Sequence, residues 1–83
     1  MTMPLKIAVV GLGVVGAETV RLIAAQQDIL SRRCGRPVVV TAVSARDKSR
    51  DRGLSLDGIE WFDDPVALAR DADADVVCEL IGG

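Results

Sequence analysis

A glycine pattern between an apolar run and an amphipathic segment most constrains how this chain can fold. Residues 5–10 are short, apolar and rich in β-branched side chains, which predicts a strand buried on both faces. Gly11, Gly13 and Gly16 follow in GxGxxG spacing. From Val14 onward, apolar residues recur every three or four positions, which predicts a helix continuing to about residue 30 or 33. A glycine-rich turn is therefore expected to join a buried strand to a helix.

Each glycine has a physical role in such a turn. Gly11 permits the tight turn out of the strand, Gly13 lets a pyrophosphate approach the backbone, and Gly16 lets the helix pack against the strand. The free N–H groups of the first helical turn attract anions. The motif consists of Gly11, Leu12, Gly13, Val14, Val15 and Gly16. In this strand–turn–helix context it predicts a dinucleotide-binding site, and the alternative is a glycine-rich turn without a ligand. The Gly-Lys-Ser/Thr ending of a P-loop is absent, which argues against a nucleoside triphosphatase.

The rest of the sequence alternates strands with helices. Gly35 followed by Pro37 ends the first helix, and Asp63 or Asp64 is expected to cap a second one. The predicted elements are a strand at 37–44, a loop at 45–58, a weak strand at 59–62, a helix from Pro65, a turn at 71–74 and a strand at 75–81. This order implies parallel strands with right-handed crossovers. We predict an α/β fold, the N-terminal portion of a Rossmann-type doubly wound parallel sheet.

The end of the second strand indicates which dinucleotide is bound. NAD sites place an acidic residue there for the ribose hydroxyls, whereas NADP sites supply an Arg for the 2′-phosphate. No acid stands at Val43, Ser44 or Ala45, and Arg46 and Lys48 follow. Arg can form two parallel hydrogen bonds to a phosphate, and Lys adds a point charge. Ala45, Arg46 and Lys48 are therefore candidate contacts that favour NADP, or the use of both cofactors. The alternative is a solvated loop of mixed charge.

The end of the last predicted strand is a second candidate contact region. Ligands of open α/β sheets bind outside the carboxyl ends of the strands. The glycines after this strand would let the backbone pass close to a ribose or a nicotinamide, so Ile81 and Gly82 are candidate cofactor contacts. Glu79 lies in an apolar run, where an unpaired carboxylate is costly. Either it pairs with a group outside these residues or it faces water at an open sheet edge.

Composition excludes several other classes of protein. The net charge is −2, without the basic excess typical of nucleic-acid-binding domains, so no nucleic-acid partner is expected. The chain has no His, and Cys34 and Cys78 lack metal-ligand spacing, so we expect neither a metal site nor a disulfide framework. Cys78 should be a small buried side chain. No signal peptide and no apolar span of ~20 residues is visible, which predicts a cytoplasmic protein without membrane contact.

Several segments together resemble the N-terminus of bacterial homoserine dehydrogenase. They are KIAVVGLGVVG at 6–16, AVSARD at 42–47, the Asp64-Pro65 helix start and VVCELIGG at 76–83. The resemblance spans nearly the whole chain, and the combination is more specific than the glycine motif alone. Val14 departs from the family, which often has Thr at this position. The change removes a hydroxyl near the phosphates but leaves the backbone donors in place.

The resemblance implies an enzyme that interconverts homoserine and aspartate semialdehyde by hydride transfer with NAD(P), in threonine and methionine biosynthesis. Residues 12–15 would line the pyrophosphate, and Arg46 would contact the adenosine phosphate. The family's catalytic Lys and Asp are expected beyond Gly83. Residues 1–83 would then be the N-terminal part of a dinucleotide-binding domain without a substrate domain, inactive alone. The expected partners are a nicotinamide dinucleotide and an amino-acid substrate, and the complete protein is expected to be a homo-oligomer.

Two other functions are compatible with these residues. One is another nicotinamide-dependent dehydrogenase with the same opening, such as an aspartate or semialdehyde dehydrogenase. The other is a non-enzymatic NAD(P)-sensing module, such as a ligand-gated regulator. Sequence after Gly83 would separate the three. A Lys-bearing strand end and a substrate domain would indicate homoserine dehydrogenase, whereas a DNA-binding domain would indicate the regulator.

Overall fold

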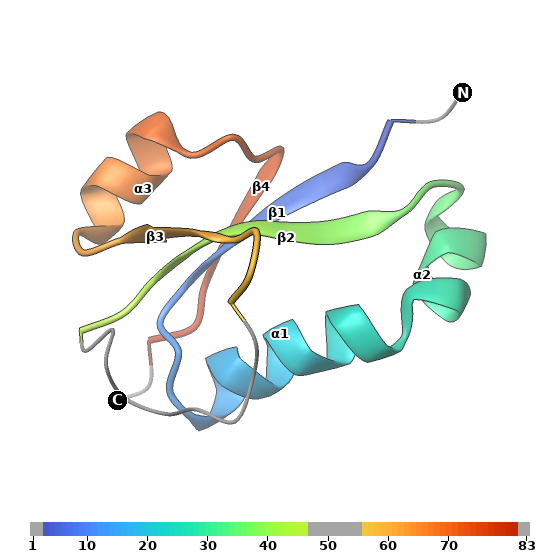
Figure 1. Cartoon of the computed structure of the whole chain (residues 1–83), viewed down its shortest axis with the longest axis horizontal. Coiled ribbons are helices and arrows are strands. Elements are labelled where there is room, and N and C mark those ends of the chain that lie inside the picture. Colours follow the sequence, from blue (N-terminus) through green and yellow to red (C-terminus); the bar gives the residue numbers. More distant parts are fainter. Residues whose placement is uncertain (1–2, 47–55, 82–83) are drawn as a thin grey trace.

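The computed structural model describes residues 3–46 and 56–81 and shows a four-stranded, all-parallel sheet in the order β3-β2-β1-β4 (Figure 1). The strands are β1 (Leu5–Val10), β2 (Val38–Ser44), β3 (Glu60–Phe62) and β4 (Val76–Glu79). Parallel neighbours require crossover connections, and helices supply those between β1 and β2 and between β3 and β4, as the alternation of strands and helices predicted. The predicted fold class is confirmed.

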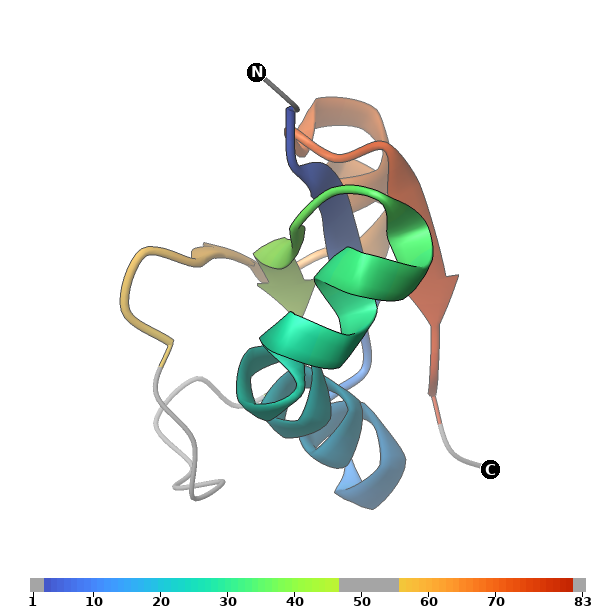
Figure 2. The same ribbon diagram turned by 90° about the vertical axis from the view of Figure 1, so that its right-hand side faces the viewer.

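Helices cover both faces of this sheet (Figures 1 and 2). Their bounds are α1 (Val14–Ala25), α2 (Gln27–Cys34) and α3 (Pro65–Asp71). On the α3 face, the core consists of Ala8, Val10, Ala42 and Leu68. On the α1 face, it consists of Val9, Leu12, Val20 and Val43. Alternate residues of β1 and β2 thus enter opposite cores, because successive strand side chains point to opposite faces. Burial on both faces explains the continuous apolar runs of these strands.

The single long helix predicted after the glycine motif is wrong, because the chain breaks at Gln26. Gln26 has φ −106° and ψ 27°, and its N–H donates to the Leu22 carbonyl at 2.8 Å to end α1. The side-chain amide of Gln27 then donates to the carbonyls of Ile23 and Val38, linking the end of α1 to the start of β2. The contact with Val38 is tertiary, so helical periodicity alone could not reveal it. The predicted stop is confirmed, since α2 ends at Gly35 with φ +75°.

Other boundaries agree closely with the sequence pattern. β1 has the predicted bounds, β2 begins one residue later than expected, and Asp64 is the cap of α3, its carboxylate accepting from the Val66 N–H at 3.0 Å. β4 is shorter than the predicted strand at 75–81. Most of the predicted loop at 45–58 lies outside the described residues. Among the residues described, no helix combines the length and the apolar character that a membrane crossing requires.

β4 is an edge strand with little cover. Val76 is 43% exposed and Val77 is 45% exposed, and Glu79 is also exposed to solvent. The expected burial of Cys78 is wrong, since this side chain is only partly buried. The physical reason is the position of the strand, because β1 pairs with one side of β4 and no described strand pairs with the other.

At the amino ends of the strands, Lys6 joins β1 to the segment before β4. The Lys6 backbone N–H donates to the Asp75 carboxylate at 2.9 Å, and the Asp75 N–H donates to the Lys6 carbonyl at 2.8 Å. The Lys6 ammonium pairs with Asp73 at 2.8 Å. The hydrogen bond and the charge of Asp73 raise the pKa of Lys6 above its ordinary value of 10.5. This end of the sheet is therefore closed by charged contacts, opposite the end that carries the glycine turn.

Candidate dinucleotide-binding site

The glycine turn is fixed at the carboxyl end of β1 by the strands on both sides. The Gly11 N–H donates to the Ser44 carbonyl of β2 at 2.7 Å, and the Leu80 N–H donates to the Val10 carbonyl at 2.8 Å. Gly11 has φ +95°, a conformation that side chains with a Cβ rarely adopt. A Cβ here would also lie 3.0 Å from the Ile81 backbone nitrogen. Gly11 is therefore required both by its dihedral angle and by the close approach of the chain after β4.

The other two glycines of the motif have contrasting surroundings. A Cβ on Gly16 would lie 1.7 Å from the Gly11 carbonyl oxygen, so α1 packs directly onto the turn. A Cβ on Gly13 would meet no atom within 4 Å. Within the described residues, Gly13 therefore has no internal packing reason to be glycine. This open space lies at the N-terminus of a helix, where an anion would approach the backbone.

The first turn of α1 presents its backbone to solvent. Gly13 is the N-cap residue, no side chain caps the helix, and its first turn contains no acidic residue. Val14 is 88% exposed and Val15 is 63% exposed, so neither side chain is used in the core. The first N–H groups of a helix lack intrahelical partners and carry partial positive charge. This terminus can therefore bind an anion through its backbone.

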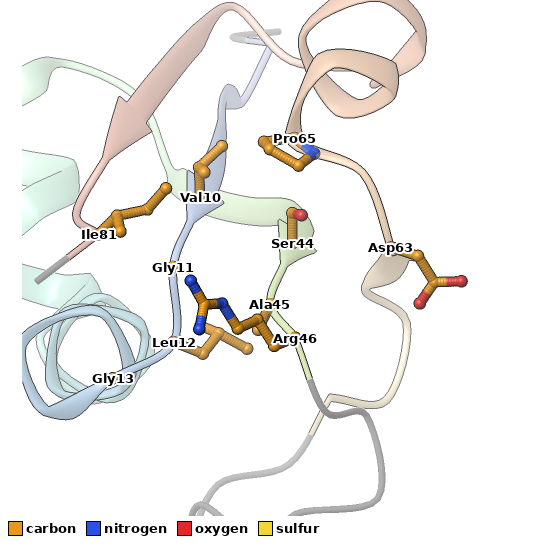
Figure 3. A pocket seen from close by; sticks show the side chains of 10 residues that line it. All are labelled: Val10, Gly11, Leu12, Gly13, Ser44, Ala45, Arg46, Asp63, Pro65 and Ile81. Carbon is orange, nitrogen blue, oxygen red and sulfur yellow. The ribbon is translucent and has the colours of Figure 1, made fainter.

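A pocket of about 540 Å³ opens at this end of the sheet (Figure 3). Its volume lies within the usual range of ligand sites, roughly 300–1,000 Å³. It is bounded by the end of β1, the end of β2 and the segments that follow β3 and β4. The lining residues are Val10, Gly11, Leu12, Gly13, Ser44, Ala45, Arg46, Asp63, Pro65 and Ile81. The carboxyl ends of parallel strands thus form one concave site, as expected for an open α/β sheet.

Most of the candidate residues from the sequence lie in or beside this pocket. The structure brings together Gly11, Leu12, Gly13, Ala45, Arg46 and Ile81 as lining residues. Val14 and Val15 follow directly in the first turn of α1, and Gly16 packs beneath the turn without lining the pocket. Lys48 and Gly82 lie outside the described residues.

Sequence reasoning missed the other lining residues. They are Val10, Ser44, Asp63 and Pro65. Val10 and Ser44 are the last residues of buried strands, a position that could have marked them as ligand-facing. Asp63 and Pro65 were interpreted only in relation to a helix start. Their place in the pocket depends on the packing of α3 against the α3 face of the sheet.

The polar groups of the pocket differ in exposure. Arg46 is exposed, and its side chain extends back toward the glycine turn (Figure 3). Asp63 is exposed at the rim, and its carboxylate accepts from the Trp61 indole N–H at 2.9 Å. Ser44 is only 3% exposed, and its hydroxyl is directed toward Pro65 (Figure 3). In the described part of the chain, no three His, Cys, Asp or Glu residues gather as metal ligands would.

Fold and site together define the class of protein. A parallel sheet with helices on both faces, a GxGxxG turn at the end of β1 and a pocket over the carboxyl ends of the strands characterise the Rossmann-type α/β class.

Comparison with known proteins finds relatives in both sequence and structure. No family model matches the chain. It is 35% identical over 80 residues to a homoserine dehydrogenase of Methylobacillus glycogenes, covering 96% of this chain. It is 37% identical over 79 residues to that of Mycobacterium tuberculosis, covering 95% of this chain. The fold matches a crystal structure of Staphylococcus aureus homoserine dehydrogenase with a TM-score of 0.82 and 28% identity over 100% of this chain.

The resemblance read from the sequence is thus confirmed in both sequence and fold, and over the segment it spans the chain is similar to homoserine dehydrogenases. That segment is a small share of the related proteins. The chain covers 19% of the Methylobacillus relative, 18% of the Mycobacterium relative and 21% of the Staphylococcus structure.

Proposed function

We propose that the pocket binds the dinucleotide NAD(P), with the pyrophosphate against the glycine turn and the first turn of α1. The observation that carries this proposal is the contrast between Gly13 and Gly16. Packing requires a glycine at position 16, whereas the glycine at position 13 only keeps the approach to the helix N-terminus open. An uncapped helix N-terminus favours a phosphate through its N–H groups and its dipole.

The complete protein is proposed to be a homoserine dehydrogenase. Its reaction would convert L-homoserine and NAD(P)⁺ to L-aspartate 4-semialdehyde, NAD(P)H and a proton, by hydride transfer to the nicotinamide. The relatives in sequence and in structure support this activity by their names. In this proposal residues 1–83 hold part of the cofactor, and the catalytic groups and substrate domain lie outside them. Other dehydrogenases and an NAD(P)-sensing module lose support, because the relatives named above are homoserine dehydrogenases.

NADP is the proposed cofactor, with NAD as a second one. Arg46 follows β2 and lines the pocket, where its guanidinium can form paired hydrogen bonds to a 2′-phosphate. The chain offers no acidic side chain at the last two residues of β2 or at Ala45 to accept from the ribose hydroxyls of NAD. Lys48 and Gly82 remain proposed contacts on sequence grounds alone.

The proposed setting of the protein follows its proposed reaction. Its partners would be the nicotinamide dinucleotide and a small amino-acid substrate, with neither nucleic acid nor membrane involved. A cytoplasmic location and a homo-oligomeric complete protein belong to the same proposal.

The test combines binding with turnover in the purified protein that contains this segment. Calorimetric titration should show binding of NADPH, and homoserine should drive the reduction of NADP⁺ measured at 340 nm as NADPH appears. Glycerol at the same concentration is a control alcohol without the amino-acid groups. Binding of NADPH without homoserine-dependent reduction in the complete protein would favour a sensing module. Absence of binding would refute the proposed cofactor site.

A further inference from the structure

We draw no further inference here: the strongest candidate, the edge of β4 with its exposed Val76 and Val77, carries nothing, because nothing in the described part of the chain shows what covers this edge.

Discussion

Replacing Gly13 and replacing Gly16 should have different consequences, and Gly16→Ala should mainly reduce stability. In an ordinary helix this substitution stabilises by about 1 kcal/mol. Here the new Cβ would lie 1.7 Å from the Gly11 carbonyl oxygen, whereas real Cβ contacts are essentially never below 3.0 Å. Because the contacted atom belongs to the backbone, no side-chain rotation can relieve the overlap, and α1 must move away from the turn.

The size of this effect can be worked from typical costs. Overpacking costs about 1–3 kcal/mol, and a backbone clash belongs at the upper end of that range. After subtraction of the helix-propensity gain, we expect a net loss of about 2 kcal/mol. For a domain of 60–100 residues this loss corresponds to a fall in Tm of roughly 8–16 °C. It would be a large share of the stability of a small domain, which starts near 5 kcal/mol.

Gly13→Val should mainly remove cofactor binding. Gly13 has φ −69° and ψ −161°, and a Cβ there meets no atom within 4 Å, so a side chain fits the folded chain. Valine at a helix N-cap costs under about 1 kcal/mol relative to glycine. Its branched side chain would nevertheless occupy the space in which the pyrophosphate must approach the backbone. We therefore expect a nearly unchanged Tm and no measurable NADPH affinity.

Both variants can be examined in the same two assays. Thermal unfolding followed by circular dichroism reports the change in stability, and calorimetric titration with NADPH reports the binding. Gly16→Ala with the parent Tm would refute the packing argument. Unchanged NADPH affinity in Gly13→Val would remove the glycine motif from the proposed cofactor site.

Three further predictions concern specificity, completeness and pH. Arg46→Ala should weaken NADP(H) more than NAD(H), by about 1.5–3 kcal/mol for a charged hydrogen bond, and calorimetry showing equal losses would make Arg46 a surface charge only. Residues 1–83 alone should lack a cooperative thermal transition, because β4 leaves an open edge and the chain buries little surface. They should also fail to reduce NAD(P)⁺ with homoserine, because the proposed catalytic groups lie outside them. A cooperative melt or measurable turnover would contradict this prediction. Asp73→Asn should lower the Tm at neutral pH. Because Asp73 raises the pKa of Lys6 above 10.5, the difference in Tm between the variant and the parent should disappear as the pH rises through that pKa. A difference in Tm that stays constant in melts recorded on both sides of this pKa would show that the ion pair does not cause it.

Local signals made much of the fold predictable. The glycine spacing, the apolar runs of β1 and β2, and the Asp64-Pro65 start of α3 each depend on a few neighbouring residues, and the structure confirms them. The break between α1 and α2 was not predictable in this way, because Gln27 contacts the Val38 carbonyl eleven residues away. Exposure of β4 depends equally on tertiary context, since the apolar pattern that suggested a buried Cys78 does not reveal which strand lies at an edge.

The candidate site was predictable where one segment builds it and not where several meet. The glycine motif and Arg46 were found from sequence because a few adjacent residues determine their chemistry. Asp63, Pro65 and Ser44 were missed because each enters the pocket only when β2, β3 and α3 are assembled. Ser44 in particular was seen only as a position without an acid, since the face to which its side chain points follows from the register of β2.

The contacts of Gly11 show why the site depends on the whole sheet. Its N–H is bonded to Ser44 of β2, its carbonyl lies under Gly16 of α1, and its Cα faces the backbone that follows β4. The turn that would receive the pyrophosphate is therefore held by elements from both ends of the described chain. Because β4 is an exposed edge, any loosening of that strand would also release one side of the turn. A ligand that binds only the ordered turn is linked to the folding of the strands that order it. A segment that covers β4 should therefore stabilise the cofactor site as well as the sheet.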